Sequence, residues 1–387
     1  MNRNKTVLSV LILAVSVVGL GMGATLPVVA LRMYQAQASA LAIGLLAAMP
    51  AVGMMISAFL VEGLCRRLSR RGIYLFALGL CGLSVAAIDP LASWPWLLAA
   101  ARLAMGIGMG VVIILGEAWV NEISPDNVRG RVVALYATCF TAFQMLGPAT
   151  VAWLGAGGPW VNLLVLASLA VALALVAFIM PASPAVHEHK GGGFSVLGFV
   201  RVAPALCMGV LFFSFFDSVV LSMFPVYAAG MGHGLAVAAL MSSVILAGDA
   251  AFQLPLGWLS DRCERGGLYL ACGLLVLALG VGLPWLMGSG AWLWPALLLL
   301  GAVAGGIYTL AIVLIGERFE GPELVTANAS AGLIWGLGSL LGPLASGALM
   351  GTGPQGVPVA LSSLAALFVA CAWGYQRQAR RLLEVAR

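Results

Sequence analysis

Long apolar runs, separated by short polar segments, are the feature that most constrains this chain. The hydrocarbon core of a bilayer is about 30 Å thick, and a helix needs about 20 apolar residues to cross it. Inside that core the backbone must satisfy its own hydrogen bonds, which a helix does within one segment. Twelve such runs follow one another, over residues 6–31, 40–64, 72–88, 95–117, 131–154, 159–180, 203–229, 235–259, 266–287, 292–316, 327–350 and 357–375. The sequence therefore predicts an all-α integral membrane protein with twelve transmembrane helices.

The scarcity of charge excludes a water-soluble globule. Only 9% of the 387 residues are charged and 62% are hydrophobic, whereas soluble domains carry roughly 25% charged residues. Because so few polar side chains cannot cover a soluble surface, the lipid bilayer must cover most of it. A disordered chain is excluded by the same hydrophobicity, and no Gly-X-Y period supports a collagen-like chain. The net charge of +5 does not indicate nucleic acid as a partner.

The placement of Lys and Arg predicts the orientation. With both termini in the cytoplasm, 17 of the 19 basic residues lie in inside segments. Arg32 falls outside and Arg102 falls within a span. Because basic residues accumulate in short cytoplasmic loops, this distribution predicts an N-in, C-in topology and an even number of spans.

The two halves of the chain resemble each other. Four landmarks recur at offsets of 195, 195, 200 and 198 residues: Gly72-x-Tyr74 as Gly267-x-Tyr269, Gly147-Pro148 as Gly342-Pro343, Gly116-Glu117 as Gly316-Glu317, and Pro27 as Pro225. Parallel repeats of six spans are one recurrent transporter architecture. We expect a six-helix bundle over residues 1–180, a cytoplasmic linker over 181–202 and a second six-helix bundle over 203–387.

Metal and disulfide chemistry receive little support from the sequence. His187 and His189 lie two residues apart in the linker, where a metal-binding tract is conceivable but a solvated loop is the simpler interpretation. The seven cysteines are scattered and form no C-x-x-C pair. We predict no disulfide, no metal site and no cofactor.

The loop after the eighth span carries a motif with a known resemblance. Its sequence, Gly257-Trp-Leu-Ser-Asp261-Arg262-Cys-Glu-Arg265-Gly, resembles the loop signature of the major facilitator superfamily. The resemblance covers nearly all of the chain and is to a bacterial branch grouped with drug and sugar effluxers. It implies the twelve-helix major facilitator fold and transport by alternating access, by a monomer in the bacterial cytoplasmic (inner) membrane.

In the signature loop we expect a cytoplasmic gate. Gly257 would let two helices touch, and the Asp261 carboxylate would accept from helix N-terminal amides or pair with an arginine across the half. A loop whose charges only set the topology is the alternative. The first-half loop departs from the pattern, because Arg66 replaces the aspartate and only Glu62 offers a nearby acid.

The inner end of the fourth span adds further gate candidates. Glu117, Arg129 and Arg131 follow one another there, and we expect them to pair with the loop region, together with Arg262. Exchange of such ion pairs would report the transport state. The alternative is that they are surface charges, which contribute little to stability.

Arg102 is the first candidate for substrate binding. Arg102-x-x-x-Gly106 resembles an element of the superfamily in the same span. An arginine within a span costs several kcal/mol unless it faces the bundle interior or water, which makes it a functional candidate. Snorkelling to the outer interface is the alternative.

Gly-Pro pairs occur in the fifth and eleventh spans. The superfamily's drug antiporters carry a G-x-x-x-G-P-x-x-G-G element in the fifth span. Here Gly338-x-x-x-Gly342-Pro343-x-x-Ser346-Gly347 is the better copy and Gly147-Pro148 retains little of it, which weakens the inference to antiport. Helix packing alone would also explain both.

Two acids within spans are candidates for proton coupling. An ionised carboxylate is costly in the membrane, so Asp217 and Asp249 are expected to bind protons, with Asp217 preferred. Asp249 has a second interpretation, as a support for the loop at Asp261, and a structural hydrogen bond between helices is possible for both acids. Aromatic residues that we expect to line a central pocket with Asp217 are Phe213, Phe216, Tyr227, Phe252, Tyr308 and Trp335. Each ring could equally serve helix packing.

The sequence therefore predicts a proton-coupled secondary active transporter that exports a small organic molecule. A phosphate-binding G-x-x-x-x-G-K-[ST] loop is missing, and no hydrolase motif is present, so we expect a transporter and not an enzyme. Proton-coupled uptake of a nutrient is the main alternative. A copper ion is a less favoured substrate, suggested by Met105-x-x-x-Met109 and Met231-Gly-His233. A channel or a membrane enzyme fits the repeated halves less well.

Overall fold

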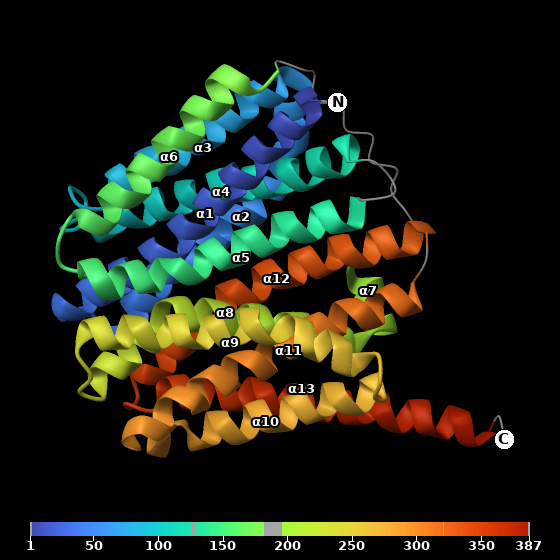
Figure 1. Cartoon of the computed structure of the whole chain (residues 1–387). Helices are drawn as coiled ribbons and strands as arrows, with labels where there is room; N and C mark the ends of the chain where they lie inside the picture. The colour runs from blue at the N-terminus through green and yellow to red at the C-terminus, as the bar shows by residue number, and fades with distance from the viewer. Residues whose placement is uncertain (1, 125–128, 182–195, 320, 386–387) are drawn as a thin grey trace. The chain divides into compact units, whose positions relative to one another are not determined.

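Every long element of the protein is an α-helix (Figure 1). The computed structural model describes residues 2–124, 129–181, 196–319 and 321–385. The helices are α1 (Asn2–Gln35), α2 (Ala40–Arg67), α3 (Arg70–Ala86), α4 (Pro95–Ile123), α5 (Arg129–Leu154), α6 (Trp160–Ile179), α7 (Val196–Val202), α8 (Pro204–Gly230), α9 (Leu235–Ser260), α10 (Arg265–Leu286), α11 (Leu293–Arg318), α12 (Gly321–Met350) and α13 (Gly356–Val385), with a short 3₁₀ turn at Gly290–Trp292.

Twelve of these helices correspond to the twelve predicted spans. Eleven are long and apolar enough to cross a bilayer, judged by length and composition. The other, α3, has 17 residues, which is about 26 Å of helix. Large apolar side chains are exposed on several helices, among them Trp153, Phe178 and Leu254. Exposing so large an apolar surface to water is unfavourable, so this surface is suited to contact with lipid.

Several helices extend beyond the predicted spans. α4 continues to Ile123 instead of ending at residue 117, and α13 continues to Val385 instead of residue 375. Apolar composition marks only the part of a helix inside the hydrocarbon. Polar residues continue the helix into the headgroup region, where backbone hydrogen bonds are still formed.

Local signals in the sequence account for several helix ends. Pro95 and Pro204 occupy the first positions of α4 and α8, where a missing N–H costs nothing. The Ser69 side chain accepts a hydrogen bond from the Gly72 backbone N–H and caps α3. These three helices therefore start at residues suited to a helix N-terminus.

The chain divides into two compact units. Unit 1 contains residues 1–38, 45–189 and 234–240, and unit 2 contains residues 39–44, 190–233 and 241–387. In unit 1, α1 packs along α5 and also contacts α4 and α6, while α3 lies against α4 and α6 (Figure 1). In unit 2, α8 packs along α12 and contacts α11 and α13, while α10 lies against α11 and α13. The two units thus repeat one pattern of helix contacts.

Glycines at matching positions make the same helix crossings in both units. In unit 1, Gly53 and Gly106 place α2 and α4 in backbone contact, since a Cβ on either would overlap a carbonyl oxygen of the other helix. Gly248 and Gly301, each 195 residues later, do the same for α9 and α11. Close crossing at small residues is the usual means of helix association in membranes.

The end of the predicted linker is ordered as the short helix α7. Phe199 in this helix is fully buried, and its ring lies 5.6 Å from that of Phe319, after α11. An apolar side chain therefore holds residues 196–202 against unit 2, which the polar composition of the linker did not suggest. His187 and His189 lie outside the described residues.

Candidate functional site

Arg102 is buried within unit 1 and lacks an acidic partner. Its side chain projects from α4 and only 1% of the residue is exposed. Nη1 donates to Thr25 Oγ1 on α1 at 2.8 Å and contacts Met105 Sδ at 3.6 Å. In the described part of the chain, Nε has no hydrogen-bond partner and no carboxylate lies within ion-pair distance. This burial argues against snorkelling, and the described residues supply no counter-charge for the guanidinium.

Thr25 completes the support of Arg102. Its hydroxyl donates to the Gly21 carbonyl oxygen at 2.7 Å, so its oxygen remains available to accept from the guanidinium. Thr25 is fully buried. Sequence analysis missed this residue, because a threonine in an apolar helix carries no signal of its own. The contact of Arg102 with Met105 also disfavours copper at that sulfur, because a cation already lies beside it.

Asp249 is a buried acid with a neutral partner. It is 4% exposed on α9, and Gln253 Nε2 donates to its Oδ1 at 3.3 Å, one turn along the helix. The carboxylate lies directly against Gly305 of α11, where a Cβ would overlap Oδ1. No cationic side chain pairs with it in the described residues, so the support of Asp261 that we considered for Asp249 is not formed.

Asp217 is buried on α8 in unit 2. It is 4% exposed and lies one turn from Phe213 on the same helix. α8 crosses α12 beside this acid. A Cβ on Gly338 or Gly342 would overlap the hydroxyl of Ser214 or Ser218, respectively. The Gly-x-x-x-Gly-Pro element of α12 therefore brings its backbone against the turns of α8 that carry Asp217.

Four of the six predicted aromatic residues gather in unit 2. The Phe213 ring stacks on Tyr308 with centroids 5.1 Å apart and meets Trp335 edge-on at 5.5 Å. Tyr308 and Trp335 lie 5.0 Å apart, also edge-on, and Phe216 stacks on Phe213 at 6.4 Å. We call these four residues the aromatic cluster. Their arrangement joins α8, α11 and α12 near Asp217.

The other two aromatic residues lie elsewhere. Tyr227 donates its hydroxyl to Gln355 Oε1 at 3.0 Å, at the end of α8. Phe252 is 39% exposed on α9 and forms no ring contact in the described residues. These two therefore do not belong to the aromatic cluster. The sequence could not separate them, because each is one ring in an apolar helix.

Arg265 is the centre of the charged residues in the signature loop. Its Nη2 lies 3.0 Å from Asp261 Oδ1, its Nη1 pairs with Glu317 Oε1 at the end of α11, and its Nε donates to the Ser260 carbonyl oxygen at 3.1 Å. Asp261 thus has an arginine partner, but it is a local one, four residues along the same loop, and not the arginine across the half that we expect. Arg265 itself was not among the predicted gate residues.

The two remaining loop candidates, Arg262 and Gly257, form none of the ion pairs or helix contacts described above. The Arg262 guanidinium lies over the Trp258 ring, 3.7 Å from its centroid. A Cβ on Gly257 would meet no atom within 4 Å, so the helix contact that we expect at Gly257 is not formed here.

In unit 1, the corresponding ion pair joins Arg70 to Glu122. Arg70 Nη2 and Glu122 Oε2 are 2.5 Å apart, with the arginine side chain only 6% exposed. The guanidinium also lies 5.2 Å from the centroid of Trp119. The pair thus connects the start of α3 to the end of α4.

Among the predicted first-half gate residues, none whose side chain the structure describes joins this pair. Glu62 pairs with Arg66 within α2, and both side chains are exposed. Glu117 is exposed and forms no ion pair with any residue that the structure describes. Arg131 is exposed, and the side chain of Arg129 lies outside the described residues.

The repeat corrects one of our landmarks. Arg70 and Arg265 are 195 residues apart, and so are Glu122 and Glu317. The acid equivalent to Glu317 is therefore Glu122, and the match to Glu117 at an offset of 200 was wrong. Keeping one constant offset along the whole sequence would have identified both ion pairs.

Comparison with known proteins agrees with this architecture. The family model of the Major Facilitator Superfamily matches residues 11–248 and 206–385. The uncharacterized MFS-type transporter YfkF of Bacillus subtilis (strain 168) is 27% identical over 351 residues, covering 89% of this chain and 88% of the relative. The uncharacterized MFS-type transporter YcaD of Shigella flexneri serotype 5b (strain 8401) is 27% identical over 281 residues, covering 72% and 70%.

Solved transporter structures share the fold. A bacterial homologue of the human lysosomal transporter Spinster, inward-facing and occupied, aligns with a TM-score of 0.78 at 15% identity, over 98% of this chain and 97% of that one. A D-xylose-proton symporter aligns with a TM-score of 0.71 at 19% identity, over 94% and 97%. With the family model matched along both halves, this chain belongs to the major facilitator superfamily of membrane transporters.

Proposed function

We propose that the protein is a proton-coupled secondary active transporter that exports a small organic molecule with an anionic group and an apolar ring. The observation that carries the proposal is Arg102, a buried guanidinium with an unpartnered Nε and no carboxylate nearby in the described residues. A buried charge is costly unless it is paired. An anionic group on the substrate would supply the missing partner, and halves that move alternately would carry it across the membrane.

Two buried acids support coupling to protons. Asp249 has only Gln253 as a side-chain partner in the described residues, and an ionised carboxylate so placed is costly. Binding a proton removes this cost, so Asp217 and Asp249 are the two candidate sites for the exchanged proton. Asp217 remains the preferred site, because it adjoins the aromatic cluster.

The surroundings of Asp217 favour export. The Gly338-x-x-x-Gly342-Pro343 element, which resembles that of drug antiporters, contacts α8 on both sides of this acid. A substrate that displaces a proton from Asp217 would leave as the proton enters. The ring of the substrate would stack on the aromatic cluster, an interaction worth about 0.5–1.5 kcal/mol beyond the burial of its area.

Ion pairs at the cytoplasmic ends would act as the gate. Asp261 and its partner Arg265 are held together with Glu317, while Glu62, Glu117, Arg129, Arg131, Gly257 and Arg262 are the further gate candidates. Their partners would change as the protein alternates between its two open states. Gly257, which is open in this structure, would make its helix contact in the other state.

The test is a measurement of luminal pH in proteoliposomes that contain the purified protein and a pH-sensitive dye. A panel of aromatic sulfonates is added outside without an imposed gradient, since sulfonates do not titrate near neutral pH. Antiport predicts that the lumen becomes alkaline as substrate enters, whichever way the protein is inserted. Symport, the mechanism of nutrient uptake, predicts that it becomes acidic. An unchanged pH with substrate movement would contradict proton coupling.

Variants assign the roles in the same assay. Arg102→Gln should raise the substrate KM by at least about 10-fold, because a charge-assisted contact is lost, and Arg102→Lys should recover part of this. Asp217→Asn should abolish the pH change while substrate exchange continues. If Asp249→Asn does so and Asp217→Asn does not, the proton site is Asp249. Arg67→Gln, at an exposed arginine without a described partner, is the control.

A further inference from the structure

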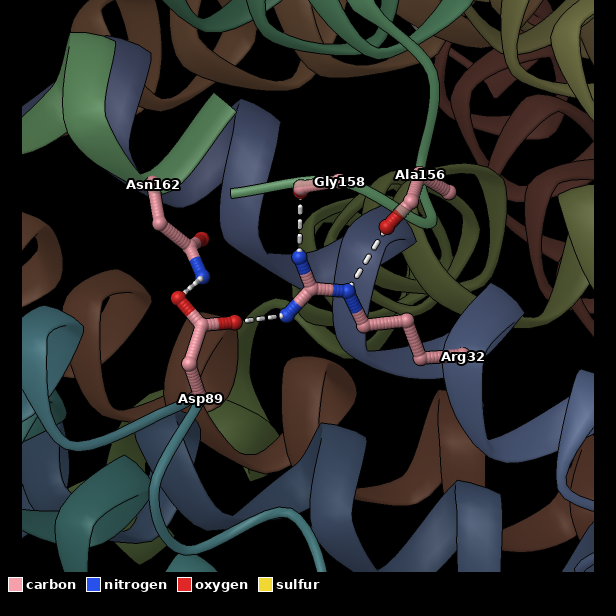
Figure 2. A network of polar contacts seen from close by, with 5 residues as sticks. All are labelled: Arg32, Asp89, Ala156, Gly158 and Asn162. Carbon is pink, nitrogen blue, oxygen red and sulfur yellow. Dashed lines mark hydrogen bonds and ion pairs between the residues drawn. The ribbon is translucent and has the colours of Figure 1, made fainter. Parts of the chain in front are cut away.

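A second polar network lies within unit 1, at the outer end of α1 (Figure 2). The Arg32 guanidinium uses all three of its nitrogens. Nη1 pairs with Asp89 Oδ1, Nε donates to the Ala156 carbonyl oxygen at 2.6 Å, and Nη2 donates to the Gly158 carbonyl oxygen at 2.7 Å. Asn162 Nδ2 donates to Asp89 Oδ2 at 3.0 Å. We call these five residues the outer anchor.

The outer anchor joins four separate parts of unit 1. Arg32 lies near the end of α1, Asp89 follows α3, Ala156 and Gly158 lie between α5 and α6, and Asn162 lies in α6. The five residues meet only because of the tertiary fold. Arg32 is the only basic residue, and Asp89 the only acid, in the predicted outer segments.

The chain prepares the carbonyl oxygens that Arg32 binds. Gly155 has a φ of +82°, in the left-handed region that favours glycine. Its N–H donates to the Val151 carbonyl oxygen at 2.9 Å and ends α5. The chain then turns, and the carbonyl groups of Ala156 and Gly158 both face the guanidinium (Figure 2).

Shielding from water makes the outer anchor stronger than an ordinary surface ion pair. The side chain of Arg32 is 18% exposed and Asn162 is 1% exposed, although Asp89 is 44% exposed. A guanidinium with three partners loses less freedom per hydrogen bond than a single exposed pair. An arginine that only set the orientation in the membrane would not need these three hydrogen-bond partners.

The position of Arg32 on α1 links the outer anchor to Arg102. Thr25, which accepts from Arg102, lies seven residues before Arg32. Two turns of helix place both side chains on the same face of α1. Pro27 lies between them inside the helix and removes one backbone hydrogen bond, so the helix is weakest there. Without the outer anchor, the helix beyond Pro27 would be held by apolar packing alone, because residues 28–31 are buried but form no other polar side-chain contact with any described residue.

The second unit has a related contact at the equivalent position. Tyr227 lies 195 residues after Arg32, follows Pro225 within α8, and donates to Gln355 before α13. Unit 2 has Leu297 at the position equivalent to Arg102. α1 and α8, the first long helices of the two units, thus each form a polar contact near a proline. Only unit 1 combines a charged contact of this kind with a buried arginine.

We propose that the outer anchor is a positioning device for Arg102, which holds α1 across Pro27 so that Thr25 stays in place to accept from the guanidinium. Arg32, Asp89 and Asn162 would be positioning residues that do not touch the substrate. This inference rests on the proposed function only for the role of Arg102 in substrate binding. The placement of Thr25 can be tested without any substrate.

The experiment compares hydrogen exchange along α1 in the purified full-length protein. Arg32→Gln should increase backbone amide exchange by about 10-fold or more over residues 20–33, on both sides of Pro27. Asp89→Asn, which keeps the two carbonyl contacts of Arg32, should give a smaller increase over the same residues. Arg67→Gln is the matched control and should leave α1 unchanged. An increase confined to residues beyond Pro27, or none, would overturn the proposal.

Binding of naphthalene-2-sulfonate, an aromatic anion, provides the second readout. We expect Arg32→Gln to weaken binding about 5-fold in the wild-type background and less than about 2-fold in a Thr25→Val background, because both changes act through one contact. If Arg32→Gln weakens binding equally in both backgrounds, the outer anchor stabilises unit 1 in general and does not act through Thr25. That result would overturn the proposal. If wild type does not bind the probe, or if Arg102→Gln does not weaken binding, the proposed function fails. Hydrogen exchange then remains as the test of whether the outer anchor holds Thr25 in place.

Discussion

Three arginines of unit 1, Arg32, Arg70 and Arg102, differ in how their charges are compensated. Arg32 binds one carboxylate and two carbonyl oxygens. Arg70 pairs with Glu122 and lies over Trp119. Among the described residues, Arg102 has only the Thr25 hydroxyl and a sulfur as partners. Arg32 and Arg70 each have a carboxylate partner, although Arg70 Nε, like Arg102 Nε, has no hydrogen-bond partner among the described residues. The missing carboxylate is what separates Arg102 from the other two, and it is the reason we propose Arg102 as the binding residue.

At the residue scale, Glu122→Gln should destabilise the protein by about 1–3 kcal/mol. The change leaves the Arg70 guanidinium, 6% exposed, without its counter-charge. Glu62→Gln is the matched control, because the Glu62–Arg66 pair is exposed on both sides and such pairs contribute at most about 1 kcal/mol. Thermal unfolding in detergent measures both. Equal melting temperatures would show that Arg70 does not depend on Glu122.

Helix crossings in both units depend on glycines with no room for a side chain. Gly106 lies against Pro50 of α2, and Gly301, its equivalent, lies against Ile245 of α9. The apolar runs predicted these helices, but which glycines lie at crossings could not be predicted. Gly63 and Gly82 are also within helices and have open space around them. A helix that is apolar on every face offers no periodicity that would reveal which side meets a neighbour.

At the element scale, Gly106→Ala and Gly301→Ala should each destabilise the protein by about 1–3 kcal/mol. The added Cβ overlaps backbone atoms, so the two helices must move apart. Gly63→Ala and Gly82→Ala should be neutral or slightly stabilising, because alanine is the better helix former. The four melting temperatures give the comparison. A loss at all four positions would mean that helix propensity, and not the crossings, governs the effect.

Taken as a whole, the molecule consists of two units with one repeated set of helix contacts and different polar residues. Gly53 and Gly248, Tyr74 and Tyr269, and the ion pairs Arg70–Glu122 and Arg265–Glu317 recur at a single offset of 195 residues. Arg102 occurs only in unit 1, while Asp217 and Asp249 occur only in unit 2. A shared scaffold thus carries a buried arginine in one half and two buried aspartates in the other.

At the scale of the whole molecule, the N-in, C-in topology predicts which side of the membrane can label Cys263. This thiol is exposed in the loop between α9 and α10. A membrane-impermeant maleimide should label it in inside-out vesicles and not in intact right-side-out vesicles. Cys263→Ser provides the background for a second variant, Thr352→Cys, placed in the exposed turn after α12. That thiol should label only from the outside, and the opposite result would invert the topology.

The sequence by itself determined the twelve spans, the expected orientation and the duplication, because a bilayer imposes its requirements on each segment separately. Apolar length, basic loops and recurring Gly-Pro pairs are all local properties. Only the tertiary structure decided that Thr25 holds Arg102, that Glu122 and not Glu117 pairs at the end of α4, and that four rings gather beside Asp217. With apolar residues on every face of most helices, no periodicity records which side meets a neighbour. The partners of the polar residues are therefore set by packing between helices far apart in the sequence.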